Sequence, residues 1–238
     1  MEHAARRQER ELADSGKMVA IKLIVAVAFG FLPTLFWLLF FLREDAARPE
    51  PKTEILKFFL IGGFLSSASA IAIEFWLKGV FAGVGIGYFS IAALLIFAFI
   101  EETTKFLSAR LLLWRDRYFD EPIDAMIYLI SVGLGFAAIE NFFELAGATA
   151  SAIPELVILR FIGATLLHAL SSGFVGYYYI RGRTARGLLV ATLLHTSFNW
   201  LILGMPGLPI YPSAILVIAA IFLFRDFDII KTVKEKFT

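Results

Sequence analysis

Residues 18–42 read MVAIKLIVAVAFGFLPTLFWLLFFL, and Lys22 is the only charged side chain among them. A helix needs about 20 mostly apolar residues to cross the hydrocarbon core of a bilayer, so this stretch predicts a membrane-spanning helix. It is longer than the apolar core of a typical signal peptide and has no evident small-residue cleavage site. We therefore expect it to be retained as a span.

The same composition continues along the rest of the chain. Its 238 residues are 59% hydrophobic and the mean hydropathy is +0.77, which is too apolar for an ordinary soluble domain. The apolar stretches long enough to cross a bilayer are 18–42, 55–77, 86–113, 123–146, 157–180, 187–204 and 210–224. The sequence predicts an all-α, polytopic transmembrane bundle of about seven spans with its active-site cavity between helices. The glycine-rich residues 79–87 are where an eighth or re-entrant segment would fit.

The connections are short, so we expect a single integral membrane domain over residues 1–238. Residues 1–17 are predicted to be a polar N-terminal tail and residues 225–238 a basic cytoplasmic C-terminal tail. Basic residues also gather at 115–117 and 181–186, whereas 147–159 and 204–213 contain none. Since short loops rich in Lys and Arg stay in the cytoplasm, this alternation places the C-terminus there. Seven spans would then put the N-terminus outside, although the four basic residues of the N-terminal tail favour the opposite side.

Charge and cysteine content exclude several classes of function. Lys and Arg total 22 against 21 for Asp and Glu, and this balance gives no support for a nucleic-acid partner. The chain contains no cysteine, which excludes a disulfide framework, a zinc–thiolate site and a cysteine nucleophile.

Polar side chains inside the predicted spans are the candidate functional residues. Such groups are costly in hydrocarbon and are kept where they face each other, a cavity or a substrate path. A single His or Asn in a membrane helix is more often a modest interhelical hydrogen bond, but a whole set at similar depth favours function. The set consists of Glu101, Glu102, Lys105, Glu140, Asn141, His168, His195 and Asn199.

Depth along each helix can be counted from the basic loops at about 1.5 Å per residue. By this count Glu101, His168, His195 and Asn199 lie roughly 14–20 Å from the predicted cytoplasmic ends of three different helices. Glu140 lies at about 27 Å, which is deeper than the others unless its helix is tilted.

Spacing within each helix adds detail. Glu101 and Lys105 are four residues apart, as are His195 and Asn199, so each pair shares one helix face. Lys105 could therefore neutralise or orient the Glu101 carboxylate. Arg160, near the outer end of its span, is expected to be interfacial.

This set of side chains suits hydrolysis. A buried glutamate can take a proton from water, and imidazole and amide donors can hold an oxyanion. The apolar core lacks an Asp, so a Ser-His-Asp triad is not indicated. Zinc held by Glu101, His168 and His195 is an alternative, although the HExxH signature is absent. A further alternative is a non-catalytic scaffold or a carrier that relays protons through the same residues.

In chain order, these residues resemble the motifs of the PrsW family of intramembrane proteases, which is related to the CAAX-processing proteases. The resemblance covers about residues 90–200 and implies a helical, glutamic-type membrane endopeptidase. It implies that Glu101 or Glu102 activates water, that His195 and Asn199 support the oxyanion, and that His168 matches the histidine of the second motif. Lys105, Glu140 and Asn141 would support them. The motifs are Glu101-Glu102-Thr103-Thr104-Lys105, GFAAIEN at 135–141, His168, and HTSFN at 195–199.

Two departures separate the chain from the CAAX relatives. Those proteins typically show EExxxR and FxxxH, whereas here Lys105 follows the glutamates at a different spacing and Ala164 occupies the Phe position. The resemblance thus favours the PrsW branch over prenyl-peptide processing. It implies that the substrate is a single-span membrane protein, such as an anti-sigma factor, cleaved in the cell (plasma) membrane without a cofactor.

Overall fold

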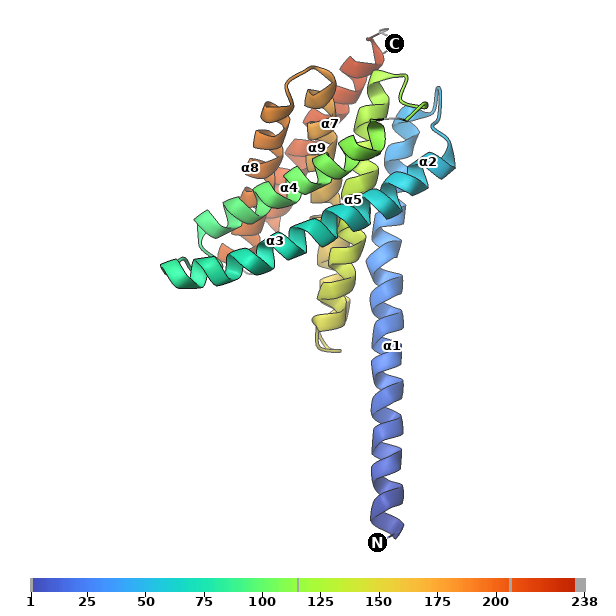
Figure 1. Cartoon of the computed structure of the whole chain (residues 1–238), viewed down its shortest axis with the longest axis vertical. Helices are drawn as coiled ribbons and strands as arrows, with labels where there is room; N and C mark the ends of the chain where they lie inside the picture. The colour runs from blue at the N-terminus through green and yellow to red at the C-terminus, as the bar shows by residue number, and fades with distance from the viewer. Residues whose placement is uncertain (1, 115, 206, 234–238) are drawn as a thin grey trace.

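The computed structural model describes residues 2–114, 116–205 and 207–233, and every regular element within them is helical (Figure 1). Two of the continuous helical segments contain a π-helical turn, η2 and η3. In chain order the elements are α1 (Glu2–Phe41) with the 3₁₀ turn η1 (Leu42–Asp45), α2 (Lys52–Lys57) with η2 (Phe58–Gly62) and α3 (Gly63–Val84), α4 (Ile91–Leu113), α5 (Pro122–Gly147), α6 (Ile153–Leu159) with η3 (Arg160–Ala164) and α7 (Thr165–Ile180), α8 (Thr184–Gly204), and α9 (Ile210–Lys231).

The all-helical prediction is confirmed, and each of the seven apolar stretches corresponds to one continuous helical segment. Within the described residues, five helices are long and apolar enough to cross a membrane, which makes the chain a polytopic membrane protein. The stretches 86–113 and 210–224 form α4 and α9, which are not among these five. Residues 79–84 simply continue α3, which ends at Gly85 in a left-handed conformation (φ 73°). The five are Gly16–Asp45, Lys52–Val84, Pro122–Gly147, Ile153–Ile180 and Thr184–Gly204.

The two predicted terminal tails are largely helical, and their place outside the membrane-embedded domain stays a prediction. Helix α1 already begins at Glu2, and α9 continues to Lys231, whose Nζ lies 2.6 Å from the carboxylate of Glu44. The reason is that neither 2–15 nor 225–231 contains a proline or glycine, and Glu, Arg and Lys are good helix formers. Residues 234–238 lie outside the described residues.

Helix α5 forms the centre of the fold, and its residues 122–138 are all buried. Pro122 occupies its first turn, and Glu121 and Asp124 form a capping box. Its contact with the η2–α3 segment depends on glycine. A Cβ atom added at Gly135 would lie 1.9 Å from the carbonyl oxygen of Phe59, so only glycine allows this backbone approach.

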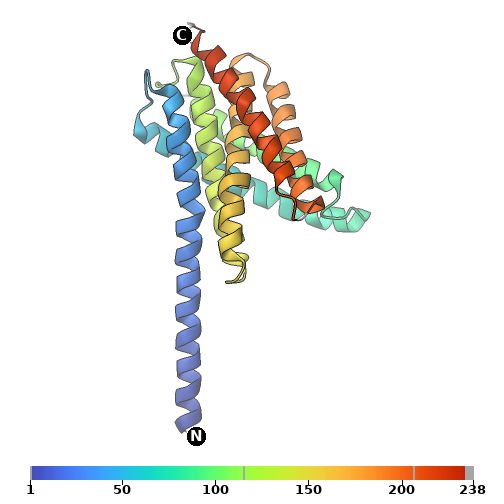
Figure 2. The ribbon, with the colours of Figure 1, turned by 180° about the vertical axis from the view of Figure 1, so that it is seen from behind.

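The helices are not all parallel (Figure 1). Helices α1, α5 and α7 run alongside one another, whereas α3 and α4 lie obliquely across this group and project to one side. Seen from behind, α9 crosses obliquely near α7 and α8 (Figure 2). The start of α1 lies at one extreme of the molecule, and the end of α9 lies at the other, together with the α4–α5 and α7–α8 connections. The described residues of the three basic segments predicted to be cytoplasmic therefore share one end of the molecule.

Candidate active site

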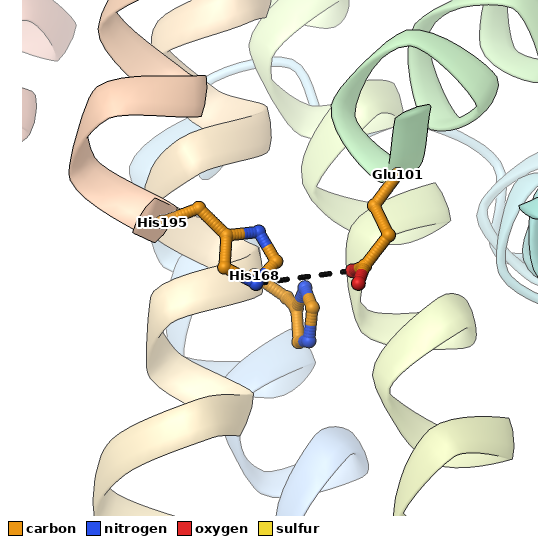
Figure 3. A group of neighbouring side chains, drawn as sticks. All are labelled: Glu101, His168 and His195. Carbon is orange, nitrogen blue, oxygen red and sulfur yellow. Dashed lines mark ion pairs between the residues drawn. The ribbon is translucent and has the colours of Figure 1, made fainter. Parts of the chain in front are cut away.

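The structure places the predicted site residues around one region between four helices. Figure 3 shows Glu101, His168 and His195 turned toward one another from three of these helices. Glu101, Glu102 and Lys105 come from α4, Glu140 and Asn141 from α5, His168 from α7, and His195 and Asn199 from α8.

Glu102 is the buried anchor of the site. Its Oε1 accepts hydrogen bonds from Lys105 Nζ at 2.7 Å, His195 Nδ1 at 2.8 Å and Ser171 Oγ at 3.1 Å. The side chain of Glu102 is fully buried and that of Lys105 is 2% exposed. Lys105 therefore pairs with the glutamate three residues before it, and not with Glu101 as the four-residue spacing suggested. The His195 ring is fixed with its Nδ1–H on this carboxylate.

His168 is held at both of its ring nitrogens. Nδ1 lies 2.8 Å from Lys105 Nζ, and Nε2 lies 2.7 Å from Glu140 Oε2. Because an ammonium group can only donate, Nδ1 accepts this bond and Nε2–H donates to Glu140. The ring of Phe136 packs 5.2 Å from the imidazole and also lies under the Lys105 ammonium at 4.7 Å.

Arg160 belongs to the site, contrary to the prediction that it is interfacial. Its Nη2 lies 2.8 Å from Glu140 Oε2, its Nε–H donates to Asn141 Oδ1, and its side chain is 13% exposed. Asn141 Nδ2 in turn donates to Thr165 Oγ1 at 3.0 Å. Arg160 lies in the π-helical turn η3, and the extra residue of such a turn changes which face a side chain occupies. No pattern in the sequence predicts that π-helical turn.

Glu140 also lies closer to the other polar residues than its counted depth suggested. The count measured distance along each helix, but α4 crosses α5 obliquely, so equal counts along the two do not mean equal depth (Figure 1). The contact between Glu140 and His168 joins α5 to the group formed by α4, α7 and α8.

Glu101 differs from the other carboxylates because its Oε2 is buried and has no hydrogen-bond partner among the described residues. The nearest ring nitrogen of His195, Nε2, lies 3.9 Å away (Figure 3). This is too long for a direct hydrogen bond and is a separation that one water molecule can bridge. Glu101 also faces a cavity of about 430 Å³, which is lined as well by Glu74, Glu140 and Asn199.

The lining of the cavity distinguishes the two adjacent glutamates, and it includes Asn199. Glu101 lines the cavity, whereas Glu102 does not. Asn199 lines it too, one helical turn after His195, so its amide is available to a molecule bound there. Chemically, the arrangement offers a carboxylate with a free oxygen and an amide at one cavity, with an oriented imidazole 3.9 Å from that carboxylate.

Comparison with known proteins identifies the family. The family model described as PrsW family intramembrane metalloprotease matches residues 50–225, a region that includes every site residue above. The chain is 30% identical over 188 residues to Protease PrsW of Geobacillus kaustophilus (strain HTA426), covering 75% of this chain and 80% of that protein. It is 27% identical over 189 residues to Protease PrsW of Bacillus subtilis (strain 168), covering 75% and 83%. No solved structure gives a significant match. The chain therefore belongs to the PrsW family of intramembrane proteases.

Proposed function

We propose that this chain is an endopeptidase that hydrolyses a peptide bond in or near the membrane segment of a single-span membrane protein, with Glu101 as the general base. The observation that carries the proposal is the free Oε2 of Glu101, buried at a cavity and 3.9 Å from His195 Nε2. A carboxylate in this setting can take a proton from a water molecule held between itself and the imidazole.

The remaining steps use Glu101 and Asn199, which line the cavity, and His195, whose Nε2 lies 3.9 Å from Glu101. Glu101 accepts a proton as the water oxygen attacks the scissile carbonyl carbon, and it then delivers that proton to the departing amine. His195 is oriented by Glu102, and as an imidazolium it donates its Nε2–H to the tetrahedral oxyanion. The side-chain amide of Asn199 is the second oxyanion donor. Each such donor is worth about 10²–10³ in kcat.

Lys105, His168, Glu140 and Asn141 serve as positioning residues in this mechanism. Both ring nitrogens of His168 are already engaged, so the ring is not free to hold the attacking water. Its ring instead joins Lys105 on α4 to Glu140 on α5. We infer that this connection fixes the distance between Glu101 and His195.

The family is described as one of metalloproteases, which implies a bound metal. Glu101, His168 and His195 offer donor atoms within 4.8 Å of one another, and they are the same three residues that the sequence suggested for zinc. However, Lys105 and Glu140 occupy both nitrogens of His168, and the Lys105 ammonium would repel a cation there. Two free donors remain, whereas a catalytic zinc usually has three protein ligands. In this arrangement the residues do not fit such a centre, and no step is assigned to a metal.

The substrate must open its own helix before cleavage, because a peptide group engaged in helical hydrogen bonds is poorly exposed to attack. The resemblance noted above favours a single-span protein of the anti-sigma-factor type. We also place the enzyme in the cell membrane with its C-terminus in the cytoplasm, as the basic segments at one end of the molecule indicate.

The decisive experiment is cleavage of purified single-span proteins by the purified enzyme, with and without a chelator. Glu101→Gln should lower the rate of cleavage by about 10²–10⁴ in a folded protein, and the control Glu155→Gln, at an exposed residue of α6, should leave it unchanged. Unchanged cleavage by Glu101→Gln would refute the assignment of the base. Loss of cleavage with chelator, restored by zinc, would favour the metal alternative. Absence of cleavage, combined with pH-dependent transport, would favour the carrier.

A further inference from the structure

A second group of carboxylates lies at the end of α1 and the start of α5, far from the active site. Asp45 ends η1, Glu50 lies in the connection to α2, and Asp124 lies in the first turn of α5. One oxygen atom from each lies within 4.8 Å of the others. Asp124 and Glu140 are 16 residues apart on one helix, so about 24 Å separates this group from the active site.

One carboxylate oxygen of Asp124 is buried and accepts no hydrogen bond among the described residues. The residue is fully buried, and its Oδ2 accepts hydrogen bonds from the backbone N–H groups of Asp120 at 3.0 Å and Glu121 at 2.7 Å. Its Oδ1 is also buried and accepts no hydrogen bond from a donor group among the described residues, although the carboxyl group of Glu50 lies close enough to share a proton with Asp124. An unsatisfied carboxylate oxygen in a protein interior is costly, which indicates that a ligand completes it.

The other two carboxylates are arranged by uncharged donors. The hydroxyl of Tyr128 donates to Glu50 Oε2, and the backbone N–H of Glu50 donates to Asp45 Oδ2 at 3.1 Å. Asp45 is 3% exposed.

The nearby basic side chains are already paired with other residues. Arg48 binds Glu121 at 2.6 Å, and Lys231 binds Glu44 at 2.6 Å. No ion pair within residues 2–114, 116–205 and 207–233 includes Asp45, Glu50 or Asp124. The three clustered carboxylates thus have no counter-charge within ion-pair distance, although Lys231 acts on Asp45 from farther away, and like charges this close need one or must take up protons.

We infer that Asp45, Glu50 and Asp124 bind a hard divalent cation, Mg²⁺ or Ca²⁺. The donors are all oxygen atoms, which suit these ions and not zinc or copper. A cavity of about 580 Å³, lined by Asp45, Asp120 and Glu121, gives access to the group. The bound cation fastens the α1–α2 connection to the start of α5, which is the central helix of the fold.

The test is a titration of the purified full-length protein with Mn²⁺ alone, followed by electron paramagnetic resonance, and then competition with Mg²⁺ or with Ca²⁺. It is done in the Glu101→Gln background, so that binding at the active site does not contribute. We expect one saturable site, and the stronger competitor identifies the natural ion. No saturable binding would overturn the inference and would favour protons shared among the carboxylates.

Variants locate the site. Asp45→Asn and Glu50→Gln remove charge but keep shape, and each should weaken binding by at least about tenfold, as loss of even a supporting group around a metal does. The matched control is Glu44→Gln, which lines the same cavity but pairs with Lys231 and should leave the affinity unchanged. Equal affinity in all three variants would overturn the assignment. If a variant does not fold, the protein without substitutions provides a second test. Its thermal unfolding midpoint should rise when Mg²⁺ or Ca²⁺ is added, and an unchanged midpoint would contradict the site.

Discussion

Glu101 and Glu102 are neighbours in the chain, yet the fold gives their carboxylates different surroundings. Adjacent helical residues point about 100° apart, so only one of them can face the cavity. Glu102 turns inward to Lys105, His195 and Ser171, whereas Glu101 keeps a free oxygen at the cavity. The sequence identified the pair but could not choose between its members, because the choice depends on which helices pack against each face of α4.

Substitution should separate these two glutamates. Glu101→Gln should lower the rate of cleavage by about 10²–10⁴ while leaving the free energy of unfolding nearly unchanged. Glu102→Gln should also destabilise the protein, by about 3–5 kcal/mol, because it leaves the buried Lys105 without its ion-pair partner. Cleavage assays and thermal unfolding in the same detergent test both statements. Equal stability of the two variants would contradict the buried-anchor role of Glu102.

Arg160 is the residue for which sequence reasoning and structure differ most. Arg160→Met removes its contacts with Glu140 and Asn141, so the His168 ring loses its firm support. We expect kcat to fall about 10²-fold, the scale of a misplaced catalytic group, with a smaller change in KM. Arg160→Lys should recover only part of the activity, since lysine keeps the charge but not the planar fork.

The control for Arg160 is Arg186→Met, at an exposed position of α8, which should keep full activity. Should Arg160→Met cleave at the normal rate, Arg160 would be a structural residue without influence on the site.

At the scale of the elements, helix positions followed from the sequence because apolar length is a local property. The arrangement of helices did not. The oblique course of α3 and α4 depends on contacts between segments far apart in the chain, such as Gly135 against Phe59. For this reason the depth count along the sequence placed Glu140 too far from the other polar residues. The sequence also did not predict the π-helical turn that brings Arg160 inward.

The contact between α5 and the η2–α3 segment predicts a pair of opposite mutational effects. Gly135→Ala should destabilise the protein by about 1–3 kcal/mol or more, because its Cβ would collide with the carbonyl oxygen of Phe59 and backbone must move. Gly79→Ala, also within a helix but with open space around it, should be neutral or stabilising by up to about 1 kcal/mol. Thermal unfolding measures both, and equal effects would show that this contact is looser than described.

For the whole molecule, the structure makes a prediction about its ends. The start of α1 and the end of α9 lie at opposite extremes, and the basic segments share the extreme with α9 (Figure 1). We expect a tag at the C-terminus to be protected from protease in intact cells and a tag at the N-terminus to be accessible. Protection of both tags would mean that the number of crossings is even, and that the basic N-terminal residues decide their side.

The acidic and basic residues in the middle of α4 have a consequence for biogenesis. Lys105 can offset Glu102 within the same helix, but Ser171 and His195 belong to helices translated later, and nothing earlier in the chain forms an ion pair with Glu101 among the described residues. A lone charge at the centre of a bilayer costs about 2.5–3.5 kcal/mol during insertion. We therefore expect the nascent α4 to stay beside the translocon until α7 and α8 emerge, so that these helices enter the lipid together and not one at a time.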